Sequence, residues 1–224
     1  MNKFLKTTVW LIFIAPLAYL AIVWNKIPET VATHFNLKGE PDEFSNKSQL
    51  WIWICVIAAV SILIYLLLIN VHRIDPKKHA AENKDRLLRI AFIIVLFMSF
   101  VSIIMIRASL VEGGLRLNIR FVFASVGFML AIIANYFPNL KPNYFAGLRL
   151  PWTLENEENW RKTHWMAGKL WFAGGLIIGF MWLFVPIVPG IIVFFILFSI
   201  MIFIPIIYSY RLYKKQKSLN SSNQ

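Results

Sequence analysis

The chain has 224 residues, of which 58% are hydrophobic and 15% charged, and its formal net charge is +12. Soluble domains contain about 25% charged residues, so this composition excludes an ordinary soluble protein and indicates a membrane protein. The positive charge does not indicate direct nucleic-acid binding, because most Lys and Arg residues flank long apolar runs, where they report membrane topology.

Six apolar runs follow one another along the chain, each close to the roughly 17–25 residues that cross a hydrocarbon core. They predict an all-α, polytopic integral membrane protein with six transmembrane helices, at residues 8–24, 51–69, 90–106, 119–137, 166–187 and 190–210. Basic residues are concentrated before the first run, between the second and third, between the fourth and fifth, and after the last. By the positive-inside rule, this distribution predicts that both termini are cytoplasmic.

The first apolar run follows the basic start MNKFLK, as in a secretory signal peptide. No small-residue cleavage site follows the apolar body, so we expect this segment to remain as the first helix. The single cysteine, Cys55, falls within the second run and cannot form an internal disulfide.

The first two spans and the loop between them, residues 1–70, form one predicted unit. Their outer loop, residues 25–50, carries apolar side chains at four-residue spacing and a turn sequence at Gly39, which is expected to need a positive φ. One interpretation is an interfacial segment that only reverses the chain. The other adds recognition of a ligand from outside, by His34, Asn36, Gly39 and Asp42.

The rest of the chain divides into a basic cytoplasmic loop at residues 71–89, a four-span region at 90–210 and a tail at 211–224. The loops are too short to hold a separate soluble domain. The tail is rich in Ser and Asn, and we expect it to be disordered.

The cytoplasmic loop at residues 138–165 is the longest polar stretch in the middle of the chain. Thr153 follows Pro151 and Trp152 and is predicted to be a helix N-cap, with acidic residues in the first turn after it. Glu157 with Arg161 and Glu158 with Lys162 are pairs four residues apart. These carboxylates are expected to form a solvated face rather than a catalytic pair, because each has a cation to neutralise it.

One face of the helix predicted after this loop carries residues three and four positions apart. They are Trp160, Thr163, His164, Ala167, Gly168 and Trp171. In the structural interpretation, the tryptophans are interfacial anchors, Gly168 allows a close approach and His164 bonds a backbone carbonyl. In the functional interpretation, Trp160, His164 and Arg149 form one cluster at the cytoplasmic face.

Arg149 lies between Gly147 and Pro151, in an irregular segment that begins near Asn139. An arginine just before a helix N-terminus can bind a phosphate headgroup or a carboxylate. The alternative is a topology-determining charge on a turn. In the fifth span, Gly175 and Gly179 form a G-x-x-x-G pattern, which indicates close helix packing and allows a homo-oligomer.

Two stretches of the chain carry a family resemblance. The run PNLKPNYFAGLRLPWTLENEENWRKTHWMAG resembles the signature of the SdpI family of bacterial membrane proteins, P-N-x(n)-G-[IL]-R-x-P-W-T-L-x-x-x-x-x-W-x-x-T-H-x-x-[AG]-G. Leu150 departs from the threonine that is frequent in the family. The outer loop, IPETVATHFNLKGEPDEF, resembles the small domain of unknown function that often opens these proteins.

The resemblance implies a location in the bacterial cytoplasmic membrane and a role in immunity. A member of the family protects its cell against a secreted hydrophobic peptide toxin and holds a transcriptional repressor at the membrane. The resemblance therefore implies that membrane lipids, a peptide toxin and a cytoplasmic repressor are partners. The signature residues that could contact a partner or headgroup are Asn139, Gly147, Arg149, Pro151, Trp152, Thr153, Trp160, Thr163, His164 and Gly168.

Enzymes and transporters are the rival classes. The histidines have no metalloprotease spacing, and the sequence shows no nucleophile elbow and no phosphate-binding loop, so we expect no catalytic residues, metal or cofactor. A transporter normally places ionisable residues within its spans, and the predicted spans lack a charged relay. The alternative that remains is a small transporter or lipid-modifying enzyme with a site at Arg149 and His164.

Overall fold

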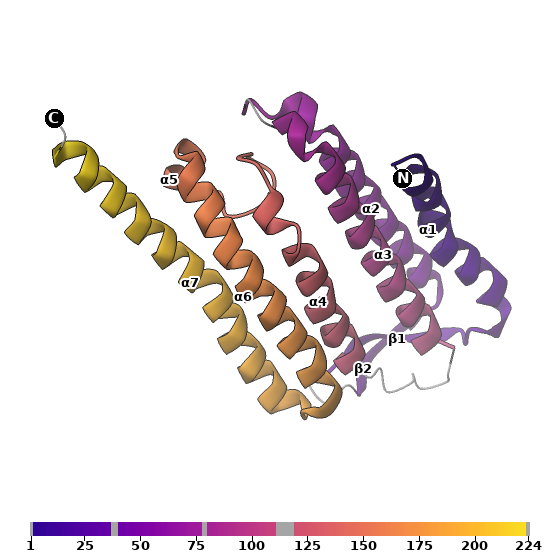
Figure 1. Ribbon diagram of the computed structural model, residues 1–224. Helices are drawn as coiled ribbons and strands as arrows, with labels where there is room; N and C mark the ends of the chain where they lie inside the picture. Colours follow the sequence, from indigo (N-terminus) through magenta and orange to yellow (C-terminus); the bar gives the residue numbers. More distant parts are fainter. Residues whose placement is uncertain (1, 37–39, 78–79, 111–118, 223–224) are drawn as a thin grey trace.

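The computed structural model describes residues 2–36, 40–77, 80–110 and 119–222. Among these residues, six helices are long and apolar enough to cross a membrane, which confirms the six predicted spans. Their bounds are Asn2–Val23 (α1), Ser48–Ile74 (α2), Lys84–Ala108 (α3), Ile119–Ala134 (α4), Glu157–Phe184 (α6) and Ile187–Ser222 (α7). In Figure 1, α3, α4, α6 and α7 follow one another across the view, and α1 and α2 pack with α3.

Both ends of the chain lie at the same end of the long helices (Figure 1). We call this end the termini end. It also holds the short helix α5 (Pro151–Glu155) and the 3-10 turns η2 (Ala80–Asn83) and η3 (Phe137–Asn139). The opposite end holds a two-stranded sheet and is called the hairpin end. The shared end follows from the even number of spans, whereas the cytoplasmic side remains a prediction.

Two helices extend well beyond the apolar runs that predicted them. α6 begins at Glu157, within the loop predicted at residues 138–165, so the second half of this loop is helical. α7 continues to Ser222, through the tail for which the composition indicated disorder. A long helix can propagate through polar residues with good helix propensity, such as the Lys and Gln in this tail, because nucleation has already occurred.

The outer loop, for which the sequence predicted an interfacial segment that reverses the chain at a turn, forms a β-hairpin. A 3-10 turn, η1 (Trp24–Lys26), leads into β1 (Thr30–Phe35), which pairs antiparallel with β2 (Pro41–Asn46). The register shifts on both sides of His34, as in a β-bulge. Apolar residues four apart share one face of a strand as well as one face of a helix, so the spacing alone could not distinguish the two structures.

The buried residues form three hydrophobic clusters. One cluster lies toward the termini end and combines side chains of both halves of the chain, from Val9 and Leu87 to Phe137 and Trp160. The other two are separate: one joins α1, α2, α3 and the hairpin, and the other joins α4, α6 and α7. The two halves therefore share a core toward the termini end and have separate cores elsewhere.

Glycines allow α4 and α6 to pack closely. A Cβ atom on Gly127 would lie 2.8 Å from the Gly175 carbonyl oxygen, and one on Gly175 would lie 2.6 Å from the Ala131 nitrogen. The G-x-x-x-G pattern at Gly175 and Gly179 is thus used in a contact within the chain, where small residues let two backbones approach.

Candidate functional site

The segment between η3 and α5 is irregular, and the side chain of Asn143 organises it. The Asn143 Oδ1 atom accepts hydrogen bonds from the Phe145 and Ala146 N–H groups, at 2.9 and 2.7 Å. Its Nδ2 atom donates to the carbonyls of Lys141 and Ala146, at 2.9 and 3.1 Å. Asn143 is fully buried. Its four hydrogen bonds pair backbone groups that have no helix or strand partners in this irregular segment.

The sequence contains two Pro-Asn pairs in this segment, and the predicted signature begins with the first. The structure places Asn139, from that pair, at the exposed end of η3. Asn143, from the second pair, is the buried residue that bonds the turn. The repeat of Pro-Asn within the motif was the signal that could have identified Asn143.

His164 joins the irregular segment to α6. Its Nε2 atom accepts a hydrogen bond from the Leu148 N–H at 2.9 Å, and its Nδ1 atom lies 2.8 Å from the Trp160 carbonyl oxygen. An N–H donor faces Nε2, so that nitrogen carries no proton, and Nδ1 must be the nitrogen that donates. The ring is therefore neutral, and both of its nitrogens are occupied by backbone groups.

Gly147 allows the segment to approach this ring. Its φ is +100°, a conformation that favours glycine, and a Cβ atom at this position would overlap the His164 Nε2 atom. Gly168 serves the same purpose one turn deeper in α6, where a Cβ atom would lie 2.9 Å from the Pro138 Cδ atom. The expected close approach at Gly168 is therefore present.

Trp160 packs inside the protein and is not an interfacial anchor, contrary to one interpretation of the sequence. Its ring stacks on the His164 ring, with centroids 3.9 Å apart, and only 1% of its surface is exposed. Its Nε1 atom donates to the Leu140 carbonyl at 2.7 Å. Trp171 likewise donates inward, to the Met201 carbonyl of α7 at 2.6 Å. Both tryptophans are fixed by protein carbonyls rather than by the membrane surface.

Thr153 is not the N-cap that the sequence predicted. It lies within α5 and is buried, where its Oγ1 atom accepts from the Leu150 N–H at 3.0 Å and lies 2.8 Å from the Leu148 carbonyl. Asn156 caps α6 instead, because its side chain accepts from the Asn159 N–H at 2.9 Å. The extended backbone at Asn156 separates α5 from α6, so the helix begins three residues later than expected.

The sequence analysis missed two polar residues, Asn159 of α6 and Ser209 of α7. Asn159 is buried and donates to the Ser209 carbonyl at 3.0 Å, and it also accepts from the Thr163 hydroxyl at 3.0 Å. Trp152, next to Pro151 at the exposed start of α5, donates from Nε1 to the Ser209 hydroxyl at 3.0 Å. These bonds explain the signature position Trp152 as a contact that attaches the segment to α7, and Thr163 as a partner of the buried Asn159 that bonds α7.

Residues of the loop between α2 and α3 attach the same segment to the first half of the chain. Asn83 is fully buried and exchanges two hydrogen bonds with the Lys141 backbone, at 3.0 and 2.9 Å. The Tyr144 N–H donates to the Asp75 carboxylate at 2.8 Å, and the Lys77 ammonium donates to the Leu154 carbonyl at 2.8 Å. We call these contacts the joint. No local pattern in the sequence indicated them, because the partners lie far apart in the chain.

Arg149 is exposed and stands apart from the stacked rings. Its Nη1 atom donates to the Tyr144 carbonyl at 2.8 Å, and the residue is linked to His164 only through its neighbour Leu148. The structure thus brings Trp160 and His164 into contact and leaves the guanidinium of Arg149 at the surface.

At the hairpin end, His34 and Asp42 form an exposed pair across the strands, with Nδ1 and Oδ1 2.6 Å apart. The hydrogen bond and the charge of Asp42 raise the pKa of His34 above its usual value of 6.5. The Asn36 side chain accepts from the Glu40 N–H at 3.1 Å and so closes the turn. Gly39 lies outside the described residues.

An apolar pocket of about 330 Å³ lies beneath the hairpin. It is lined by Ala32 and Thr33 of β1, Leu50 and Trp53 of α2, and Met105, Ala108 and Ser109 at the end of α3. Trp53 is 49% exposed, so the pocket has a large aromatic side chain available at its edge. The arrangement can accept an apolar group at the hairpin end of the helices.

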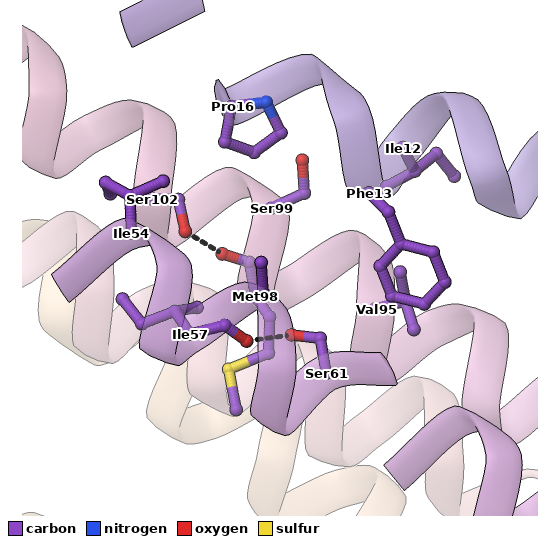
Figure 2. A pocket seen from close by; sticks show the side chains of 11 residues that line it. Ile12, Phe13, Pro16, Ile54, Ile57, Ser61, Val95, Met98, Ser99 and Ser102 are labelled. Carbon is purple, nitrogen blue, oxygen red and sulfur yellow. Dashed lines mark hydrogen bonds between the residues drawn. The ribbon is translucent and has the colours of Figure 1, made fainter. Parts of the chain in front are cut away.

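Figure 2 shows a small pocket between α1, α2 and α3. Ser61 and Ser102 bond carbonyls of their own helices, at 2.7 and 2.9 Å, while Pro16 interrupts the hydrogen bonds of α1. The serines are therefore satisfied within their helices, as is usual for hydroxyls in membrane spans.

Comparison with known families gives two matches. Residues 139–209 match the SdpI/YfhL protein family, and residues 11–66 match a domain of unknown function, DUF1648. Both agree with the resemblance found in the sequence, which they confirm. No curated protein and no solved structure matches the chain.

Proposed function

Because the chain carries an SdpI/YfhL region preceded by a DUF1648 region, we propose that it is a non-enzymatic immunity protein of the bacterial cytoplasmic membrane. It protects the cell against a secreted, hydrophobic antimicrobial peptide. The family match supports a membrane immunity-type function. The peptide as ligand and the outer side of the hairpin are further parts of the proposal.

The apolar pocket beneath the hairpin is the observation that carries this proposal. A hydrophobic peptide that reaches the membrane surface needs an apolar site there, and the pocket offers one beside the exposed ring of Trp53. Phe44 of β2 is also 49% exposed, which extends the apolar surface onto the hairpin. The polar residues His34, Asn36 and Asp42 lie on the same hairpin and can fix the orientation of the bound peptide.

The geometry of the signature segment supports a non-enzymatic role. Both nitrogens of His164 already bond backbone groups, so the ring has no free nitrogen with which to accept a proton from a substrate. Arg149 lies at the surface without the histidine beside it. These contacts disfavour the transporter or lipid-modifying enzyme with a site at Arg149 and His164.

The proposed function is tested by survival of a toxin-sensitive host that expresses the chain, challenged with a panel of secreted peptides. Ala32→Phe, which fills the pocket, is expected to abolish protection at unchanged protein abundance. Thr30→Phe is the matched control, because Thr30 lies on the same strand but does not line the pocket. Equal protection by both variants would show that the pocket does not bind the peptide. An altered lipid profile without peptide binding would instead favour an enzyme.

A second role, holding a cytoplasmic repressor at the membrane, is proposed for the termini end. Arg149 is the exposed signature residue suited to a protein carboxylate. Arg149→Ala is expected to abolish capture of the repressor while protection against the peptide survives. Loss of both activities would indicate a single shared site.

The proposed orientation is tested with impermeant thiol reagents in a Cys55→Ser background. Glu43 in β2 and Glu155 in α5 are both exposed and lie at opposite ends of the helices. Glu43→Cys is expected to react from outside the cell, and Glu155→Cys to react only after the membrane is opened. The reverse pattern would contradict the receptor role of the hairpin.

A further inference from the structure

An open crevice of about 1060 Å³ lies at the termini end, between the start of α3 and the start of α6. Leu140 and the buried Trp160 are among the residues that line it. Its sides carry cations from three different elements: Arg86 of α3, Lys141 of the irregular segment and Arg161 of α6. The crevice thus faces both halves of the chain.

The three cations keep hydrogen-bonding capacity for a ligand. The Arg86 Nη1 atom donates to the Glu82 carbonyl at 2.7 Å. The other N–H groups of the guanidinium can donate to a ligand. The Lys141 ammonium lies 3.8 Å from the Glu82 carboxylate and is half exposed. Arg161 is exposed and interacts electrostatically with Glu158.

Two carboxylates also line the crevice, and each already interacts within the protein. Glu158 lies 2.6 Å from the Lys162 ammonium and accepts from Gln216 at 3.2 Å. Glu157 likewise has an interaction of its own. The lining thus carries three cations and two carboxylates, of which Glu158 is paired with Lys162, so its net charge is positive.

The crevice lies at the polar starts of two candidate membrane spans. α3 and α6 both begin at this end, so residues near their first turns lie where apolar spans meet polar loops. Four residues after Arg161, the exposed ring of Trp165 carries the Lys169 ammonium 3.5 Å from its centroid. Exposed tryptophan and lysine side chains of this kind mark the membrane interface.

We propose that this crevice binds the phosphate of a phospholipid headgroup. Arginine forks match phosphate oxygens in pairs, and basic pockets between transmembrane helices are suited to lipid headgroups. A lipid, rather than a free phosphate, fits because the crevice lies between the polar starts of two helices whose apolar parts are candidate membrane spans. The bound lipid contacts both halves of the chain beside the joint.

The test is native mass spectrometry of the full chain in detergent micelles. Phosphatidylethanolamine and phosphatidylglycerol are titrated separately, and diacylglycerol, which lacks the phosphate, is the control lipid. Either phospholipid is expected to be retained, and diacylglycerol is expected to be lost. The triple variant Arg86→Gln, Lys141→Gln, Arg161→Gln is expected to bind at least about tenfold more weakly, because it loses charge-assisted hydrogen bonds.

A matched variant removes the same charge outside the crevice, with Arg211→Gln, Lys214→Gln and Lys215→Gln on the exposed end of α7. It is expected to bind phospholipid as the parent chain does. Equal weakening of both variants would overturn the site, since only the total charge would then matter. Arg161→Gln alone, at the surface, keeps the test valid if the triple variant does not fold.

Two competition measurements address other ligands. Displacement of the lipid by millimolar inorganic phosphate would assign the site to free phosphate and overturn the proposal. Displacement by a short acidic peptide at low concentration would assign the crevice to a protein partner and overturn it as well. Retention of the lipid against both supports the headgroup assignment.

Discussion

Replacing Gly147 with alanine should destabilise the protein mainly through His164. The φ of +100° costs an L-residue roughly 1–2 kcal/mol. The new Cβ atom also overlaps the His164 Nε2 atom, so the ring must move and the Leu148 N–H loses its acceptor. A buried polar group left without a partner costs roughly 1–3 kcal/mol. The free energy of unfolding is therefore expected to fall by about 2–5 kcal/mol.

A double-mutant cycle separates the two contributions. In a His164→Ala background the overlap is absent, so Gly147→Ala should cost only the conformational part, roughly 1–2 kcal/mol. The free energy is measured by reversible unfolding in mixed detergent micelles, followed by tryptophan fluorescence. If Gly147→Ala costs the same in both backgrounds, the contact with the ring does not explain the glycine.

Three further predictions concern other parts of the molecule. Asn143→Ala removes four hydrogen bonds and should lower the free energy of unfolding by about 2–4 kcal/mol. Asn139→Ala, at an exposed position, should change it by less than about 0.5 kcal/mol. Similar losses in the two variants would contradict the role of Asn143 in organising the irregular segment. Gly175→Leu should separate α4 from α6 and cost about 2–3 kcal/mol, while Ile177→Leu on the exposed face of α6 should be nearly neutral; a change in self-association with unaltered stability would refute the intramolecular role. The His34–Asp42 pair stabilises the hairpin fully below pH 6.5, and this contribution is lost as pH rises through the raised pKa of His34. Asp42→Asn should therefore return that pKa toward 6.5 in an NMR titration, and an unchanged pKa would show that the pair does not form.

The spans were predictable because each is a property of a local run of residues. An apolar stretch of sufficient length must form a helix in a membrane, since its backbone groups have no other partners there. The ends of the helices were less predictable. The start of α6 depends on the cap at Asn156, which competes with the equally suitable Thr153 beside Pro151.

The site was predictable only where a residue acts through its own neighbours. Gly147 and His164 were identified from the signature, and Gly168 from its spacing along the helix. Asn83 and Asp75 were not, because their partners are 58 and 69 residues away and the contacts are single hydrogen bonds rather than periodic patterns. Trp160 is buried, although one interpretation of the sequence made it an interfacial anchor. A tryptophan near a helix start suits the interface and the interior equally well, so the sequence could not distinguish the two.

The position of the joint has a consequence for exchanging parts between related proteins. The DUF1648 match ends at residue 66, and the SdpI/YfhL match begins at residue 139. Asp75, Lys77 and Asn83 lie in the interval between the two matches. A chimera cut where the second match begins, at residue 139, would therefore separate the irregular segment from the side chains that pair its backbone, whereas a cut at residue 66 would keep them together. A chimera should fold only when residues 75–83 and residues 138–155 come from the same parent protein. The unit that must be exchanged together is therefore a pair of distant loops rather than either matched region alone.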